Sequence, residues 1–313
     1  MKIKKNIWLS VLIIFTVLAS LNAESLKNSP ENKLVIGYSG APSNVDFWNK
    51  LKRSLFLRAK ELDVIVIDFS AHNFTLEAQK AALIRAVELK VDGMIIGAVS
   101  QEIADSIDMF RINKIPVVAV NMPIENEWIS TTIATNNQKA AELAGKFLLD
   151  RLKKKGDKAK RVVILCGDKV QEDALIRARV PHNILLDAGY DVHDYYAKEW
   201  SSKYSLMDAI SEYKNNAEDI VALFSCYAGA SIAGVEVAES FAKRPIQVGF
   251  DMDKNMRKMI KTGRLDATVI QNPQEIGRVG IQSIVKLLKE DKPLSDLIEI
   301  PARLITRDNI DKL

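Results

Sequence analysis

Short apolar runs alternate along the chain with longer segments in which apolar residues recur at helical spacing. Most of the short runs lack polar alternation, which is typical of strands buried on both faces of a parallel sheet. We predict strands at residues 34–38, 64–68, 91–99, 115–120, 161–166, 192–196, 220–225, 246–250, 267–270 and 297–305, the last interrupted by Pro301. We predict helices at residues 47–62, 76–90, 103–113, 138–153, 206–213, 230–241 and 275–289, one that reaches Ala188 and one that ends at Gly263.

Strands separated by helical segments indicate βαβ units, which build parallel sheets. The pattern repeats after the strand at 115–120, beginning with the helix at 138–153 and the charged, glycine-containing linker KKKGDKAK, so two halves of similar size follow one another. Each half has its own series of strands and helices, and 313 residues suffice for two domains of ordinary size. The predicted fold class is therefore α/β, with a doubly wound parallel sheet in each half.

The segment from Arg244 to Pro273 reads as strand, turn, helix, turn and strand. Asp251 follows the first of these strands and Gln271 follows the second. In open α/β sheets ligands bind beyond the carboxyl ends of the strands, so both side chains are expected at such a site. A carboxylate accepts hydrogen bonds and an amide both donates and accepts, which suits ligand hydroxyl groups. The alternative is that Asp251 only caps the following helix.

The run GFD, followed by TGRLDAT and then by a glutamine before a proline, resembles a segment of the type I periplasmic solute-binding proteins. The resemblance is to the sugar-binding, ribose- and galactose-binding-protein-like family. It implies two lobes joined by three crossover segments, a ligand cleft between the lobes, and sugar contacts from Asp251 and Gln271. LacI-type repressor effector domains share this fold, but no helix-turn-helix precedes Leu34, which argues against a repressor.

The resemblance also implies where the chain crosses between the lobes. The matching positions are near Thr135–Asn136, near Gln271–Asn272 and near Pro301. The expected lobes are 34–135 plus 272–300 at the N-terminal side, and 136–271 plus 301–313 at the C-terminal side.

Ligand contacts in the N-terminal lobe are implied by the same resemblance. Phe47 and Trp48 match two aromatic residues that stack on the sugar, whose C–H face suits an aromatic plane. Ser39 lies at the end of the first strand, and Asn121 follows the strand at 115–120, where the family commonly has an aspartate. The loop SGAPSNVDFW is longer than in the ribose-binding protein and has Val45 in place of the family's asparagine, so the identity of the sugar stays open.

In the C-terminal lobe, the resemblance assigns ligand contacts to four further residues. Asn137 matches a contact asparagine, or else it caps the helix that starts beside it. Arg179 matches an arginine that donates through a planar fork; Arg177 is its rival, and a solvated helix arginine is the alternative. Trp200 matches the aromatic residue of this lobe, and Tyr227 stands where the family has an Asn-Asp pair.

Residues 1–23 have the composition of a cleavable secretory signal peptide. Three lysines precede the apolar run Ile7–Leu18, and Leu21-Asn22-Ala23 forms a plausible cleavage site. An uncleaved anchor is the alternative, but the apolar run is short for a membrane span. No cysteine lies near the cleavage site, so we expect a periplasmic protein that is not lipidated.

Charge and cysteine content bound the remaining function classes. Three of the 44 Lys and Arg residues lie in the predicted signal peptide, which leaves 41 basic against 40 acidic residues. This near-neutral balance gives no reason to expect a nucleic acid or an anionic surface as partner. Cys166 and Cys226 each follow or end a predicted strand, and the sequence allows either a disulfide between them or two free thiols.

Catalytic and cofactor motifs are not found in the sequence. His72, His182 and His193 lack the spacing of metal ligands, and no glycine-rich phosphate loop is present. No local motif supports Cys226 with a histidine as a nucleophile pair. We therefore expect no enzyme, no bound metal and no cofactor.

The expected function is ligand capture. We expect an exported monomer that traps a small polyhydroxylated ligand, a monosaccharide or close relative, by hinge closure and delivers it to an ABC-type permease. The alternative is a sensing role, in which the closed protein docks on a sensor kinase or chemoreceptor. The fold does not distinguish the two roles, since function depends on the site and the docking face.

Overall fold

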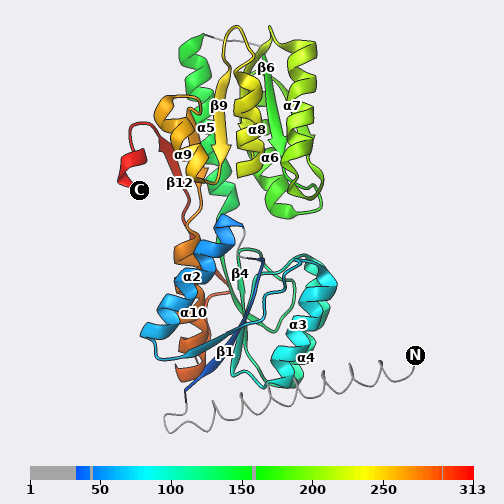
Figure 1. Cartoon of the computed structure of the whole chain (residues 1–313), viewed down its shortest axis with the longest axis vertical. Coiled ribbons are helices and arrows are strands. Elements are labelled where there is room, and N and C mark those ends of the chain that lie inside the picture. The colour runs from blue at the N-terminus through cyan, green and yellow to red at the C-terminus, as the bar shows by residue number, and fades with distance from the viewer. Residues whose placement is uncertain (1–32, 43–44, 157–159, 291) are drawn as a thin grey trace, which may run out of the picture. The chain divides into compact units, whose positions relative to one another are not determined.

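The computed structural model describes residues 33–42, 45–156, 160–290 and 292–313, so the predicted signal peptide at 1–23 lies outside the described residues. The described chain divides into two compact units (Figure 1). The first unit contains the chain up to Ala134 together with Pro273–Glu299. The second unit contains Thr135–Asn272 together with Ile300–Leu313. The chain thus passes between the units three times.

The first unit is a six-stranded sheet with helices on both faces. Its strands are β1 (Val35–Ser39), β2 (Ile65–Asp68), β3 (Gly93–Ile96), β4 (Val117–Val120), β5 (Ile129–Thr135) and β11 (Leu297–Ile300). Their order is β11-β5-β4-β3-β1-β2, and the strands from β5 to β2 are parallel. Its helices are α2 (Asp46–Glu61), α3 (Leu76–Glu88), α4 (Asp108–Ile112) and α10 (Pro273–Glu290). Helices α2 and α10 pack side by side on one face, and α3 and α4 cover the other.

The second unit repeats this plan. Its strands are β6 (Arg161–Cys166), β7 (Asp191–Tyr196), β8 (Ile220–Ser225), β9 (Ile246–Phe250), β10 (Ala267–Ile270) and β12 (Arg303–Thr306). Their order is β12-β10-β9-β8-β6-β7, with only β12 antiparallel to its neighbour. Its helices are α5 (Asn137–Lys155), α6 (Glu172–Asp187), α7 (Ser202–Asn216), α8 (Ala228–Ala238) and α9 (Lys254–Thr262). Helices α5 and α6 cover one face of the sheet and α7 and α8 the other (Figure 1).

Both sheets have the same strand order, and this confirms the predicted fold class. In each unit the first strand lies between the second and the third, so the direction of winding reverses at β1 and at β6. Such reversals leave a crevice at the carboxyl ends of the central strands, where α/β proteins bind ligands. Ligand contacts are therefore expected among the residues that follow β1, β4, β6, β9 and β10.

Helix packing in the first unit depends on one glycine. A Cβ atom added at Gly277 of α10 would lie 2.2 Å from the backbone oxygen of Leu51 in α2. Any larger residue would push the two helices apart, because both contact atoms belong to rigid helical segments. The close approach buries Leu51 and Leu55 completely against the sheet and α10.

Helix ends follow the signals in the sequence. Gly263 ends α9 in the left-handed conformation (φ 77°), as predicted. Helix α10 begins at Pro273, whose missing N–H is not needed in a first helical turn. Among the helices of the described residues, none combines the length and apolarity needed to cross a lipid bilayer.

Three segments differ from the prediction. Residues 129–135, for which no strand was predicted, form β5 between β4 and β11. The helix expected at 103–113 is a 3₁₀ turn at Gln101–Ser106 followed by the short α4. The expected strand at 297–305 is divided near Pro301 into β11 and β12, which belong to different sheets.

Candidate ligand-binding site

Asp251 and Gln271 meet at the carboxyl ends of β9 and β10. Asp251 has a left-handed backbone (φ 67°), which aspartate tolerates better than most residues, and its N–H donates to the oxygen of Val269 at 2.8 Å. Gln271 Nε2 donates to Asp251 Oδ1 at 2.8 Å. Gln271 Oε1 is buried and has no hydrogen-bond partner among the described residues. The pair therefore offers an unused acceptor beside a carboxylate.

The alternative role of Asp251 as a helix cap belongs to another residue. Helix α9 begins at Lys254, and its N-cap is Asp253, whose Oδ1 accepts from the backbone N–H of Met256 at 2.7 Å. Because Asp253 satisfies this helix end, Asp251 is not required for capping.

Asn137 and Arg177 form a second pair in the same unit. The cap of α5 is Asn136, which accepts from the backbone N–H of Lys139 at 2.8 Å, so Asn137 is not the cap. Asn137 Oδ1 instead accepts from Arg177 Nε at 2.9 Å. The two side chains thus hold each other at one face of the sheet, where α5 and α6 pack.

Arg177 is a charged residue of the protein interior, with only 4% of its surface exposed. Its Nη1 donates to the backbone oxygen of Cys226 at 3.4 Å, and Asp173 lies 3.5 Å from Nη2. The guanidinium also lies over the ring of Phe250, 4.2 Å from the centroid. A carboxylate, a carbonyl and an aromatic face together offset the desolvation of the cation.

The structure does not bring Arg179, the predicted site arginine, into this group. The Arg179 side chain is 61% exposed and lies 3.7 Å from Glu172 on the surface. Two helical residues differ by roughly 200° around the axis, so Arg177 and Arg179 face opposite sides of α6. Arg177, the alternative candidate for the site arginine, is the one that points into the protein interior.

Trp200 lies against the carboxyl end of β6. A Cβ atom added at Gly167 would lie 2.2 Å from the indole Cζ3, so only glycine leaves room for the ring. Trp200 itself has φ 55°, a costly conformation for a bulky residue and one that is often found at functional sites. Its ring centroid lies 5.9 Å from the guanidinium of Arg177.

Tyr227 supports Trp200 from the side. The two rings meet edge to face, with their centroids 5.4 Å apart. Tyr227 is buried, and its hydroxyl shares a hydrogen bond of 2.9 Å with the hydroxyl of Ser205. Burial raises the pKa of Tyr227 to about 12, so the phenol stays neutral. The Tyr227 hydroxyl is thus already hydrogen-bonded within the second unit.

In the first unit, Ser39 is buried in a network that the sequence did not predict. Its Oγ accepts from Gln79 Nε2 at 3.3 Å, and its backbone oxygen accepts from the N–H of Gly97 at 2.8 Å. Gln79 also bonds the backbone of Gly97 and Val99. One feature of the sequence could have indicated this network: Gln79 lies in the apolar stripe of α3, on the same face as Ala82 and Ala86, so its amide needs buried partners.

Phe47 and Trp48 lie together at the start of α2. Their ring centroids are 5.4 Å apart and nearly perpendicular, and Phe74 adds a third ring 5.9 Å from Trp48. A Cβ atom added at Gly97 would lie 2.4 Å from the indole of Trp48, so this ring covers the carboxyl end of β3. The two units thus share one arrangement: a tryptophan ring packs on a glycine at the carboxyl end of a strand, Trp48 on Gly97 and Trp200 on Gly167.

Asn121 repeats the geometry of Asp251. It follows β4, has φ 73°, and donates its N–H to the oxygen of Ile133 at 2.9 Å. Asparagine and aspartate are the non-glycine residues that most readily adopt this conformation. Equivalent strand ends of both units therefore present a short polar side chain.

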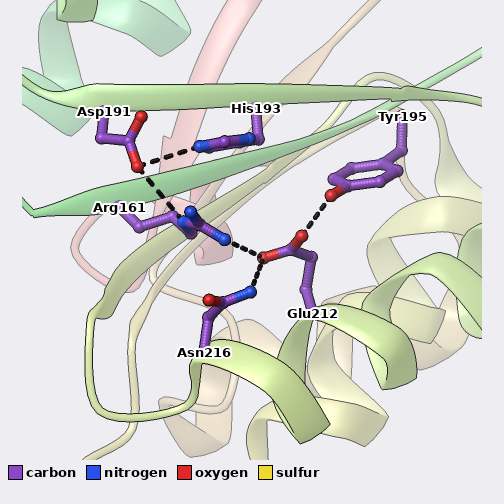
Figure 2. Close-up of polar contacts among 6 residues, drawn as sticks. All are labelled: Arg161, Asp191, His193, Tyr195, Glu212 and Asn216. Atoms are coloured by element: carbon purple, nitrogen blue, oxygen red, sulfur yellow. Dashed lines mark hydrogen bonds and ion pairs between the residues drawn. The ribbon is translucent and has the colours of Figure 1, made fainter.

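A further polar network joins β6, β7 and α7 (Figure 2). Buried Glu212 on α7 accepts from Arg161 Nη1 and Asn216 Nδ2, each at 3.1 Å, and from the hydroxyl of Tyr195. Arg161 Nε also lies 3.3 Å from Asp191. These contacts tie α7 to the edge of the sheet. In the part of the chain that the structure describes, no group of three or more His, Cys, Asp or Glu residues is arranged to hold a metal ion.

Comparison with known proteins identifies the family. The family model for the periplasmic binding protein domain matches residues 36–292. The chain belongs to this family. Among its relatives is the ribose import binding protein RbsB of Bacillus subtilis (strain 168), to which it is 25% identical over 289 residues, covering 91% of each chain.

Solved structures share the fold of this periplasmic binding protein. A periplasmic ribose ABC transporter protein from Conexibacter woesei DSM 14684 superimposes with a TM-score of 0.81 at 17% identity, covering 90% of this chain and 94% of the other. A solute-binding protein from Bacillus halodurans C-125 with bound myo-inositol gives a TM-score of 0.78 at 18% identity, covering 90% and 96%. At these identities the likeness shows the fold alone.

Proposed function

We propose that this periplasmic binding protein captures a small polyhydroxylated ligand, a monosaccharide or cyclic polyol, and delivers it to an ABC importer. The observation that carries the proposal is the Asp251–Gln271 pair, which presents a carboxylate and an unpaired amide oxygen at two adjacent strand ends. Acceptors at fixed spacing suit neighbouring hydroxyl groups. The relative named as a ribose import binding protein, and the structure holding myo-inositol, support this ligand class and the import role.

Most of the polar contacts in this proposal come from the second unit. From the second unit, Asp251 and Gln271 accept ligand hydroxyl protons, and Arg177 takes the donor role in place of Arg179, positioned by Asn137. Charge-assisted bonds from a guanidinium are stronger than neutral ones, which favours Arg177 as the donor.

The aromatic residues form the other part of the proposed site. Phe47, Trp48 and Trp200 offer their rings to the apolar C–H faces of the ligand. Asn121 adds an amide from the first unit. Ser39 and Tyr227 support their neighbours, because Ser39 is bonded to Gln79 and Tyr227 to Ser205.

The proposed mechanism is closure of the two units on the ligand. Residues from both units contact the same molecule, so the liganded protein favours the closed arrangement, which the permease recognises. Binding is the whole of the activity, and the ligand leaves chemically unchanged. We further propose export through a cleaved signal peptide at 1–23 and function as a non-lipidated periplasmic monomer.

A thermal-shift panel tests the proposal. The purified mature protein is heated with D-ribose, D-arabinose, D-fucose, D-tagatose and myo-inositol, and hits are titrated by calorimetry. A ligand at 100 times its Kd stabilises the folded state by about 2.7 kcal/mol, which gives a clear rise in Tm. Glycine and L-leucine serve as non-sugar controls. Stabilisation by none of the sugars or polyols, or by an amino acid instead, contradicts the proposed ligand class.

A further inference from the structure

The hydroxyl of Tyr38 is a buried polar group that lacks a partner. Tyr38 lies in β1 and is fully buried, and its Oη has no hydrogen-bond partner among the described residues. Folded proteins pair nearly all such groups, because an unpaired buried hydroxyl loses its bonds to water without compensation. An unpaired hydroxyl at this position therefore requires a physical explanation.

The position of this hydroxyl relates it to the ligand-binding site. A Cβ atom added at Gly40 would lie 2.3 Å from Tyr38 Oη and 3.2 Å from Cζ3 of Trp48. The hydroxyl, the backbone of Gly40 and the indole are thus immediate neighbours at the carboxyl end of β1. Glycine at position 40 leaves the space that the hydroxyl occupies.

The phenol is a hydrogen-bond donor at any physiological pH. Burial, and then the negative charge of Asp68, raise the pKa of Tyr38 well above its ordinary value. The phenol therefore keeps its proton and presents an O–H group. An acceptor oxygen is the partner that such a group lacks.

We propose that Tyr38 Oη donates a hydrogen bond to an oxygen of the ligand that stacks on Trp48, which makes Tyr38 a specificity-determining residue. This inference rests on the proposed function. Since the hydroxyl is buried beside Gly40 and Trp48, the proposal requires the indole to shift as the ligand stacks on it, and such side-chain changes at binding surfaces are common. The preferred ligand carries a hydroxyl or ring oxygen at that point, and an analogue without it leaves the phenol unpaired and is rejected.

The substitution Tyr38→Phe tests the contact through two measurements with opposite expected signs. Affinity for the best-binding sugar or polyol of the panel falls by about three- to tenfold, as expected for one lost hydrogen bond. The Tm without ligand stays the same or rises by up to about 2–4 °C, because an unpaired buried hydroxyl has been removed. Weaker binding together with an equal or higher Tm supports the proposal.

Tyr213→Phe is the matched control. Its hydroxyl donates to the oxygen of Ser240 at 2.8 Å in the second unit, so this variant should melt lower and bind as the wild-type protein does. Unchanged affinity in Tyr38→Phe overturns the inference and leaves the proposed function intact. A Tyr38→Phe protein that melts lower or fails to fold has lost an internal bond, which also overturns it. A wild-type protein that binds none of the panel overturns both proposals.

Discussion

Arg177 Nε donates a hydrogen bond of 2.9 Å to Asn137 Oδ1, joining two residues that are 40 positions apart. The bond fixes the buried guanidinium relative to the start of α5. Of the two arginines on α6, Arg177 makes this bond and is buried, whereas Arg179 is exposed.

Arg177→Lys should weaken sugar binding by roughly ten- to a hundredfold. Lysine keeps the charge but loses the planar fork that bonds Asn137 and Cys226 simultaneously. Arg179→Lys is the matched control and should change the Kd less than twofold, because Arg179 is exposed. Calorimetric titration of both variants measures the difference. An equal change in Kd for both variants would contradict a ligand contact from Arg177.

Asp251→Asn should reduce affinity by roughly ten- to a thousandfold while the Tm without ligand stays near that of the wild type. The change keeps the shape but replaces a charged acceptor, whose hydrogen bonds are worth about 1.5–3 kcal/mol each. Asp253→Ala should show the reverse pattern, because it removes the cap of α9 at a cost of about 1 kcal/mol. Melting curves and titrations on the two variants test whether Asp251 binds the ligand and Asp253 caps the helix. If Asp251→Asn binds as tightly as the wild type, the carboxylate is not a ligand contact.

Trp48→Ala and Trp200→Ala should each weaken binding by about 1–3 kcal/mol if each ring covers a sugar face. The intrinsic tryptophan fluorescence should change when the ligand is added. Gly167→Ala tests the placement of Trp200 without removing the ring, because the new methyl group would collide with the indole. We expect Gly167→Ala to weaken binding as well. Unfolding of both tryptophan variants would indicate core residues instead.

Glu212→Ala should destabilise the protein by about 3 kcal/mol and leave the Kd unchanged. The change removes the shared acceptor of Arg161, Tyr195 and Asn216, none of which is a proposed ligand contact. Chemical denaturation measures the loss. A large effect on affinity would contradict a purely structural role.

The same network predicts a dependence of stability on pH. Hydrogen bonding from His193, followed by Arg161, holds the pKa of Asp191 below its ordinary value. A lowered pKa in the folded state means that the stabilisation is present above the ordinary pKa of about 3.9 and is lost as the pH falls through the folded value. The Tm difference between the wild type and Asp191→Asn should therefore shrink below about pH 4. A constant difference would contradict the pairing.

Closure predicts a change in size. Ligand binding should lower the radius of gyration in X-ray scattering, because contacts from both units are proposed to hold one molecule. The Asp251→Asn variant at the same sugar concentration is the control. An identical radius with and without a tightly bound sugar would contradict the trap mechanism.

The sequence predicted the elements whose apolar runs have clear ends. Strands 220–225, 246–250 and 267–270 match β8, β9 and β10 residue for residue. Strand β5 was missed because its threonines read as polar. Thr131 is nevertheless buried, and its hydroxyl donates to the oxygen of Ser295 at 2.6 Å.

Within the candidate site, strand-end residues were easier to predict than helix residues. Asp251 and Gln271 follow apolar runs directly, so their neighbourhood is set by the sheet. Arg177 and Arg179 lie on a helix whose apolar stripe is weak and includes Pro181, so the inward face was not evident. Gln79 and Phe74 became visible as neighbours of Ser39 and Trp48 only in three dimensions.

The late return of α10 to the first unit has a consequence for synthesis and export. Helix α10 and strand β11 are encoded after nearly the whole second unit, yet α10 buries the α2 face that carries Leu51 and Leu55. A nascent chain that ends before Pro273 leaves that face uncovered, so the first unit cannot complete its core while it emerges. The first unit thus remains incompletely folded until α10 and β11, which lie within the last 41 residues of the chain, have been made. Under the proposed export, this late completion delays compaction of the first unit.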